Sequence, residues 1–331
     1  MKKLLFFIAI SLSIISCTNY FSEEYYDECF DCLSFYSNSG GELTISISNK
    51  KKNWDGKLFY STDRKHWKEW FGEKIEGKCI YLRGTNNTYM NKVSSQYVLA
   101  TTKYDYSELA PVDIEVGTMS FSSRKSNKCY VYCEGNIETL LDYKTVQRGE
   151  HPKMADYCFY RFFEKTPLIT SPELPAEELS KGCYCLMFFY SDLIIPPELP
   201  ARKLEEACYQ DMFRVCLNLS YLPELPSTQL APYCYCGMFF SCLIVSQNLP
   251  SLPATVLPHH CYSSMFDLNS VYLVAEENLS KVDLSRFNIK LWSLPKCSFL
   301  GTKSTEVMFC NYDSSYCEEE PVPGKQYYII F

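Results

Sequence analysis

Residues 208–230 read CYQDMFRVCLNLSYLPELPSTQL, and a unit of this form recurs along the middle of the chain. Each unit opens with a cysteine and an aromatic residue, and a second pair that ends in phenylalanine follows four residues later. Successive units are spaced 25, 25, 26 and 27 residues apart. A period of this length is typical of a solenoid, in which each unit buries its apolar face against its neighbours. The units begin at Cys158, Cys183, Cys208, Cys234 and Cys261.

Each unit predicts one short helix and one short strand. Cys208 and Met212 stand four residues apart, as do the aromatic residues that follow them, which places both pairs on one helix face. Leu219–Pro226 is too rich in proline for a helix, and its alternation is that of a short strand ended by prolines. The sequence therefore predicts leucine-rich-repeat coils with parallel strands stacked about 4.8 Å apart.

The proline-rich phrase of each unit predicts a buried column and an exposed one. This phrase contains the pattern Leu-Pro-(Ala or Ser)-x-x-Leu. Its first leucine keeps the same position in every unit, which predicts burial for Leu174, Leu199, Leu225 and Leu252. Because side chains alternate along a strand, the glutamates that precede the first three of these leucines are expected to be exposed. The candidate contact surface comprises these glutamates and flanking positions that vary in chemistry: Glu173, Glu198, Glu224, Thr170, Ile195, Tyr221 and Asn248.

Like charges stacked at strand spacing either remain solvated or meet a cation or a basic partner. Solvation alone is the alternative to binding, because exposed glutamate is common on protein surfaces. An aromatic side chain such as Tyr221 beside Glu224 is a typical hot spot of a binding surface.

The repeated pattern, with its Pro-x-Leu-Pro-Ala continuation, resembles the BspA-like leucine-rich-repeat surface proteins of bacteria, particularly those of spirochaetes and Bacteroides-type anaerobes. Residues 58–63 with Trp67, and residues 80–87, are similar to the β domain that often precedes such repeats. The resemblance covers roughly residues 41–300. It implies an adhesive or host-interacting role at the cell surface, and no reaction. One departure is Ser191, which stands where later units have cysteine.

The N-terminal residues have the form of a lipoprotein signal. Lys2 and Lys3 precede an apolar run to Ile15, and Ser16 and Cys17 follow it. This pattern predicts a lipid on Cys17 that anchors the protein in the cell envelope, at the outer membrane or cell surface. An ordinary secretory signal cut elsewhere is the alternative.

The predicted fold class is α+β, with five segments. Residues 1–16 are the lipoprotein signal peptide and residues 17–40 a tether. Residues 41–136, which alternate as strands separated by turns, predict an antiparallel β-sandwich-like domain. Residues 137–268 are expected to form the leucine-rich-repeat α/β solenoid with an N-terminal cap, and residues 269–331 its C-terminal cap.

Charge and cysteine content narrow the function classes. A net charge of −7 without a basic cluster argues against nucleic acid as a partner. The chain has 18 cysteines, of which those at repeat positions fit buried thiols. The better disulfide candidates lie outside the repeats, at Cys29, Cys32, Cys129, Cys133, Cys297, Cys310 and Cys317.

No pattern predicts a metal, a cofactor or a catalytic residue. The pairs Cys183/Cys185 and Cys234/Cys236 lie two repeats apart, about 10 Å, which is too far for one zinc ion. His259 and His260 fit a polar turn better than a ligand pair. Ser61–Trp67 resembles a single imperfect Asp-box hairpin, which is a structural turn.

The sequence therefore predicts a lipid-anchored binding protein rather than an enzyme. Its partner would be the membrane, through Cys17, and a host or extracellular-matrix protein or glycan, through the repeats. One alternative is a structural envelope lipoprotein with no specific ligand. A carbohydrate-active enzyme is the other, disfavoured because no catalytic constellation is recognisable.

Overall fold

The computed structural model describes residues 31–47, 53–91, 117–123 and 129–242. Beyond Cys242 it describes residues 250, 252–254, 256, 258, 260–262, 265, 282–283 and 328–329. Cys17, Asn248 and the predicted signal peptide lie outside these ranges. Of the predicted C-terminal cap, the described part is the antiparallel pair of β9 (Val282–Asp283) and β10 (Tyr328–Ile329).

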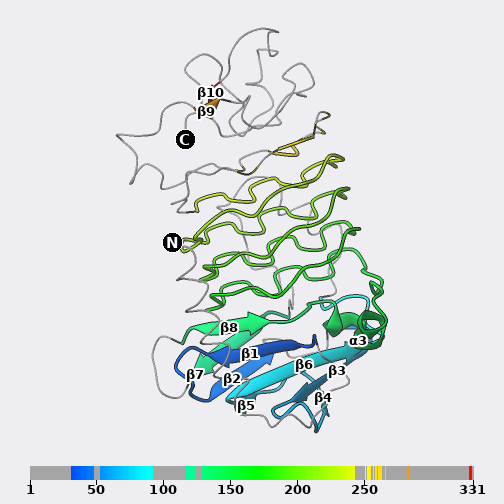
Figure 1. The fold of residues 1–331 in the computed structure, drawn as a ribbon, viewed down its shortest axis with the longest axis vertical. Helices are drawn as coiled ribbons and strands as arrows, with labels where there is room; N and C mark the ends of the chain where they lie inside the picture. The colour runs from blue at the N-terminus through cyan, green and yellow to red at the C-terminus, as the bar shows by residue number, and fades with distance from the viewer. Residues whose placement is uncertain are drawn as a thin grey trace, which may run out of the picture. The chain divides into compact units, whose positions relative to one another are not determined.

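Two antiparallel sheets form the N-terminal domain (Figure 1). The five-stranded sheet has the order β4-β3-β6-β1-β8, and the three-stranded sheet has the order β5-β2-β7. Buried apolar side chains from both sheets, such as Ile45 and Ile80, belong to one core. The bounds are β1 (Leu33–Ser37), β2 (Leu43–Ile47), β3 (Lys57–Ser61), β4 (Lys68–Trp70), β5 (Ile75–Gly77), β6 (Cys79–Thr85), β7 (Met119–Ser123) and β8 (Val131–Glu134).

The β domain extends further toward the N terminus than the sequence analysis placed it. Strand β1 lies within the predicted tether of residues 17–40, yet it pairs with both β6 and β8. Leu33 and Phe35 point into the core and are fully buried. The short Leu-x-Phe alternation therefore forms a strand, even though the glycine- and serine-rich turn of residues 37–41 follows it.

One helix, α3 (Thr139–Gln147), occurs among the described residues, and it packs against β6. The contact is close, because a Cβ atom on Gly84 of β6 would lie 1.8 Å from the Leu140 carbonyl oxygen. Buried Asn87 links the helix to β3, since its side-chain amide donates to the carbonyl oxygens of Lys57 and Leu140, at 2.9 Å each. The helix thus completes the β domain.

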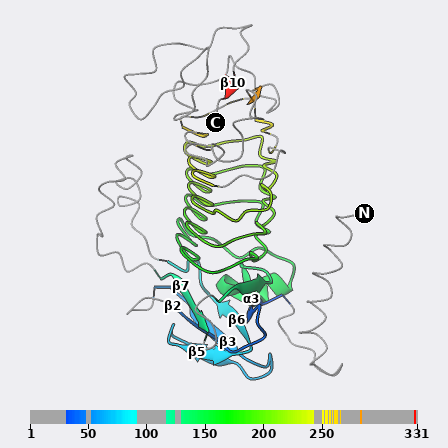
Figure 2. The ribbon, with the colours of Figure 1, turned by 90° about the vertical axis from the view of Figure 1, so that its left-hand side faces the viewer.

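The repeats are stacked turns, which lie one above another in Figure 2. In the first unit, alternate backbone N–H groups from Tyr157 to Lys165 donate to carbonyl oxygens of the next unit at 2.7–3.2 Å. The intervening N–H groups donate three residues back within their own unit, as Tyr160 does to Tyr157 at 3.0 Å. Every fourth residue has a left-handed backbone, with φ values of 58°, 54° and 54° at Tyr157, Arg161 and Lys165.

The predicted α/β leucine-rich-repeat solenoid is therefore wrong. A left-handed residue at every fourth position interrupts a right-handed helix, and half of the N–H groups bond to the neighbouring unit instead of four residues back. The expected strands are reduced to isolated bridges, such as Thr170↔Ile195 and Lys203↔Gln229. The described residues form mostly sheet with one helix, and the repeats do not close into a helix-and-strand solenoid.

Side-chain ladders hold the stacked turns together. Phe159, Tyr184, Tyr209, Tyr235 and Tyr262 stack with ring centroids 5.7–5.9 Å apart and near-parallel planes. A second ladder of phenylalanines has centroid distances of 5.6–5.7 Å. Buried aromatic side chains remove much apolar area from water, so these ladders contribute strongly to stability. The predicted buried column is confirmed: Leu174, Leu199, Leu225 and Leu252 are all buried.

The cysteines of the repeats occupy buried columns, and no disulfide joins two cysteines that the structure describes. One column uses its thiols as hydrogen-bond donors: Cys216 Sγ donates to the carbonyl oxygen of Phe188 in the preceding unit, at 3.0 Å. The same column contains Ser191, whose hydroxyl lies 3.4 Å from Cys216 Sγ. A short side chain with a donor thus suits this column better than a purely apolar one.

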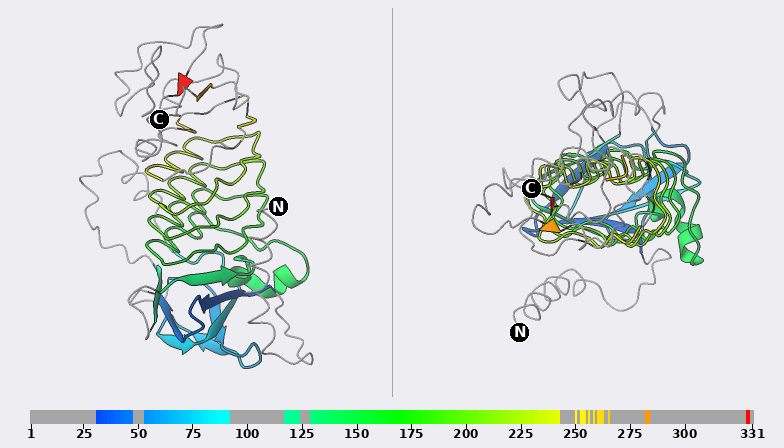
Figure 3. Two further views of the ribbon diagram at one scale, coloured as in Figure 1. Left: turned by 60° about the vertical axis from the view of Figure 1, so that its left-hand side comes forward. Right: turned by 90° about the horizontal axis from the view of Figure 1, so that it is seen from above.

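Strand β8 joins the sheet to the first repeat. It pairs antiparallel with β1 on one side and forms a parallel bridge between Val131 and Leu168 on the other. Seen from above, the coils of successive repeats overlie one another (Figure 3). The N–H of Met119 also donates to the carbonyl oxygen of Phe162, at 2.9 Å. The β domain therefore satisfies backbone groups that the first unit could not pair alone.

Candidate binding groove

A surface groove of about 360 Å³ lies between the proline-rich phrases of the second and third repeats. We call it the proline groove. Three of the candidate residues from the sequence analysis, Glu198, Tyr221 and Glu224, line it. The full lining comprises Pro197, Glu198, Leu199, Pro200, Tyr221, Leu222, Pro223, Glu224 and Pro226.

The local sequence explains why these side chains face solvent. Leu199 and Leu225 are buried at 3% and 1% exposure and anchor their phrases in the core. Glu198 and Glu224 precede them, so they point to the opposite side of extended backbone and are exposed. The prolines restrict φ and favour this extended conformation, which keeps the groove walls rigid.

Tyr221 is the exposed aromatic residue of the groove, with 46% of its surface accessible. Its hydroxyl lies 3.5 Å from the carbonyl oxygen of Pro196, one repeat earlier. The preceding residue, Ser220, fixes the register, because its N–H and its hydroxyl both donate to Ile194 O at 2.9 and 2.8 Å. Partial burial, with the nearby carboxylate of Glu198, raises the pKa of Tyr221. The tyrosine is therefore protonated at neutral pH.

The negative charge of the groove is not compensated by neighbouring cations. Glu198 and Glu224 form no ion pair with any residue in the described ranges. Other glutamates of the repeats differ, since Glu206 pairs with Lys181 at 2.7 Å. Two carboxylates one repeat apart are thus left to solvent or to a ligand.

The other candidate residues do not line this groove. Thr170 is half-buried, and its hydroxyl accepts from Cys133 N at 2.8 Å and donates to Cys133 O at 2.9 Å, so it attaches the first repeat to β8. Ile195 is also half-buried and donates its N–H to Ile169 O at 3.0 Å. Glu173 is exposed but lies one repeat before the groove.

The proline walls are the part of the site that sequence reasoning missed. The alternation predicts that these prolines end strands, whereas in the structure Pro197 and Pro223 line the groove from buried positions and Pro200 and Pro226 from half-buried ones. The available signal was the recurrence of Pro-x-Leu-Pro in adjacent units. Recurrence at the same phase places the prolines side by side in a stack.

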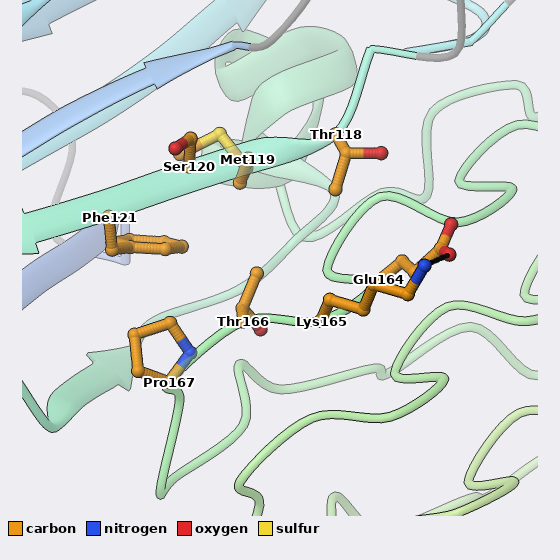
Figure 4. A pocket seen from close by; sticks show the side chains of 8 residues that line it. All are labelled: Thr118, Met119, Ser120, Phe121, Glu164, Lys165, Thr166 and Pro167. Atoms are coloured by element: carbon orange, nitrogen blue, oxygen red, sulfur yellow. Dashed lines mark ion pairs between the residues drawn. The ribbon is translucent and has the colours of Figure 1, made fainter. Parts of the chain in front are cut away.

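A second hollow, of about 330 Å³, lies between β7 and the first repeat (Figure 4). Its charged side chains are already paired. Glu164 is mostly buried and lies 3.4 Å from both Arg161 and Lys165. The lining comprises Thr118, Met119, Ser120, Phe121, Glu164, Lys165, Thr166 and Pro167. This hollow therefore offers a ligand less uncompensated charge than the proline groove does.

The turn between β3 and β4 is held by Asp63, as expected of a structural hairpin. Its carboxylate accepts from the N–H groups of Lys65 and His66, at 2.9 Å each, and lies 2.7 Å from His66 Nδ1. Desolvation acts to raise its pKa, but these hydrogen bonds and that of Ser61 lower the pKa of Asp63 overall. The carboxylate is therefore occupied within its own turn.

The repeat cysteines are poorly suited to metal binding or nucleophilic chemistry. Burial raises the pKa of Cys216 to about 11 and that of Cys234 to about 12, so both remain thiols at neutral pH. In the described ranges, no group of three or more histidine, cysteine, aspartate or glutamate side chains is placed to hold a metal ion. Within the same residues, no helix is both long and apolar enough to cross a membrane.

In comparisons with known proteins, no family model, no curated protein and no solved structure matches this chain. The resemblance to BspA-like surface proteins thus remains a prediction from the sequence, and the role of the proline groove is argued from its own geometry.

Proposed function

We propose that the protein is a lipid-anchored surface protein that binds an extracellular partner through the proline groove. The observation that carries this proposal is the placement in one groove of half-exposed Tyr221 and two carboxylates, Glu198 and Glu224, that form no ion pair with a described residue. A tyrosine at the centre of a concave surface is a typical hot spot, because it offers a large rigid contact area with a polar end.

The rigidity of the groove favours binding. Its walls are extended, proline-rich segments whose leucines are held in the core, so little conformational entropy remains to be lost when a partner binds. The hydrogen bonds of Ser220 to Ile194 fix the two walls relative to each other. A preformed surface of this kind can bind tightly even when its area is small.

The proposed location rests on the N-terminal sequence. A lipid on Cys17 would hold the protein at the outer membrane or cell surface, where the repeats would meet host or extracellular-matrix proteins or glycans. The resemblance to bacterial surface repeat proteins supports the same role in adhesion.

The test is adhesion of bacteria that display the full-length protein to host cells or matrix. Replacing Tyr221, Glu198 and Glu224 with alanine should reduce adhesion to the level of cells without the protein. The matched control replaces one exposed tyrosine and two exposed glutamates elsewhere on the repeats: Tyr190, Glu177 and Glu178. This control should adhere like the parent.

Circular dichroism and melting of both variants establish that the fold is retained. If the groove variant is folded, displayed at parental levels and still adheres like the parent, the contact surface lies elsewhere. If the parent itself confers no adhesion and binds no protein or glycan on an array, a structural envelope role replaces the proposal.

A further inference from the structure

The proline groove also restricts the chemistry of its partner, because its side chains accept hydrogen bonds but scarcely donate them. Four of its nine residues are prolines, which have no N–H, and its leucines are apolar. Glu198 and Glu224 are acceptors when ionised. The one side-chain donor of the lining is the hydroxyl of Tyr221, which makes a long hydrogen bond of 3.5 Å to the Pro196 carbonyl oxygen.

Among the side chains of this lining acceptors and negative charge prevail, so a ligand side chain that supplies donors and positive charge is complementary to them. Sugar hydroxyls both donate and accept, so a neutral glycan would find few donors among these side chains. Anionic glycans and phosphates would meet two uncompensated carboxylates. Lysine and arginine side chains are donors only and carry the complementary charge.

The cations of this protein leave the two carboxylates available. Arg202 and Lys203 follow the second phrase directly, yet neither forms an ion pair with Glu198 or Glu224. Lys203 instead lies 3.8 Å from Glu205. The described part of the chain therefore provides no internal partner that a basic ligand would have to displace.

The apolar walls and the tyrosine ring match the rest of such a side chain. A lysine or arginine stem is apolar and can lie along Pro200 and Pro226, the half-buried prolines of the lining, while its charged end reaches the carboxylates. A half-exposed tyrosine ring attracts a cation through its negative face. The volume of about 360 Å³ is in the range of small ligand sites, enough for a side chain with its flanking backbone.

We propose that the proline groove binds an extended peptide segment of the partner protein through a lysine or arginine side chain, held between Glu198 and Glu224 against the ring of Tyr221. This inference rests on the proposed binding function and names the partner as a basic protein segment rather than a glycan.

The experiment uses the full-length protein in detergent and an array of immobilised short peptides. Each peptide has one central arginine, lysine, citrulline or acetyl-lysine between alanine and glycine residues. Citrulline keeps the shape of arginine without the charge, and acetyl-lysine removes the charge of lysine while adding an acetyl group. The parent should bind the charged peptides at least about fivefold more strongly than the neutral ones, and added salt should reduce this preference.

Glu198→Gln with Glu224→Gln should abolish the preference, because the amides keep the size of the side chains and remove the charge. The control Glu177→Gln with Glu178→Gln should retain it. Tyr221→Phe should retain most of the preference, whereas Tyr221→Ala should weaken binding about fivefold. Equal binding of arginine and citrulline peptides, no detectable binding, or an unchanged preference in the double glutamine variant would each overturn the inference.

The two proposals can fail separately. If the alanine variant of the groove loses adhesion but a neutral oligosaccharide competes and basic peptides do not, the groove binds a partner of another class and this inference fails alone. If the peptide preference is present but adhesion is unaffected by the groove variant, the proposed function fails and the inference holds.

Discussion

The thiol of Cys242 donates a hydrogen bond to the carbonyl oxygen of Phe213, one repeat earlier, with 2.9 Å between sulfur and oxygen. Cys216 makes the equivalent bond to Phe188, so the interaction recurs along the stack. Cys208 belongs to a different, fully buried column, in which the thiol contact with a neighbouring repeat is longer: Cys234 Sγ lies 4.0 Å from the carbonyl oxygen of Cys261. Cysteine therefore fills two roles in these repeats, as a donor and as an apolar residue.

Substitution by serine should separate these two roles. Cys242→Ser keeps a donor near the Phe213 carbonyl oxygen and should change the free energy of unfolding by less than about 1 kcal/mol. Cys208→Ser buries a hydroxyl in a column that lacks the close inter-repeat acceptor of Cys242 and should cost about 1–3 kcal/mol. Denaturant unfolding measures both values. Equal losses in the two variants would contradict the assignment of a donor role to Cys242.

The stacked turns should lose stability when a buried leucine of one proline-rich phrase is replaced. Leu199→Asp places a charge without a partner at a site that is 3% exposed, and the cost should be about 3–5 kcal/mol. Leu199→Ala should cost about 2–4 kcal/mol through the lost burial and the cavity. The proline groove should be lost with the phrase, so the aspartate variant should bind no peptide. A melting temperature equal to that of the parent would exclude this anchoring role.

Substitutions at the residues with positive φ distinguish the observed turns from the helix that the sequence predicted, because glycine is favoured in the turns and disfavoured in a helix. Lys165 is exposed and has a φ of 54°, so Lys165→Gly should stabilise the fold by up to about 1 kcal/mol, less the small contribution of the lost ion pair with Glu164. In a helix the same change would destabilise by a similar amount. Gly182→Ala should cost at least about 2 kcal/mol, because its Cβ would lie 2.1 Å from the buried ring of Tyr157. Thermal unfolding of the two variants decides between the conformations.

The sequence predicted the spacing of the repeats and the identity of the buried leucines, because both follow from recurrence and alternation. It predicted the wrong backbone for the Cys-Tyr-x-x-Met-Phe half. Residues four apart lie on one face of a helix, but they also repeat in turns with a left-handed residue at every fourth position. Glycine marks this position at Gly182 and Gly237, whereas Leu186 and Val215 occupy it elsewhere and conceal the signal.

The sequence also does not predict features that depend on contacts between segments distant along the chain. Strand β8 supports the first repeat through Thr170 and Leu168, a pairing that no local pattern encodes. The exposure of Glu198 and Glu224 followed from alternation, but the groove between them depends on two proline phrases that lie side by side only in the stack.

The lipid anchor is tested by removing its attachment site. Cys17→Ala should move the protein from the detergent phase to the aqueous phase when membranes of a bacterial host are extracted and partitioned. Metabolic labelling with a radioactive fatty acid should mark the parent and leave the variant unlabelled. Parental partitioning and labelling of the variant would remove the lipoprotein prediction, with no consequence for the proline groove.

The carboxylate of Glu138 is 1% exposed and lies 2.8 Å from His151 Nδ1. Burial raises the pKa of Glu138, and the hydrogen bond and charge of His151 offset this rise only in part. A raised pKa means that the folded state binds the proton more tightly than the unfolded state does. The resulting contribution to stability is complete below the unfolded pKa, about 4.3, and is lost as the pH rises through the folded value.

Glu138→Gln removes this titration while keeping a side chain that can donate to His151. The free energy of unfolding of the variant minus that of the parent should therefore increase as the pH rises from about 4 to 7, so that the variant gains stability relative to the parent. Glu150→Gln, an exposed position whose partner is Arg148 at 3.0 Å, should show a nearly constant difference over the same range. Urea unfolding at several pH values gives both curves. A difference for Glu138→Gln that is flat, or that falls with rising pH, would show that the buried carboxylate is not destabilised by its surroundings.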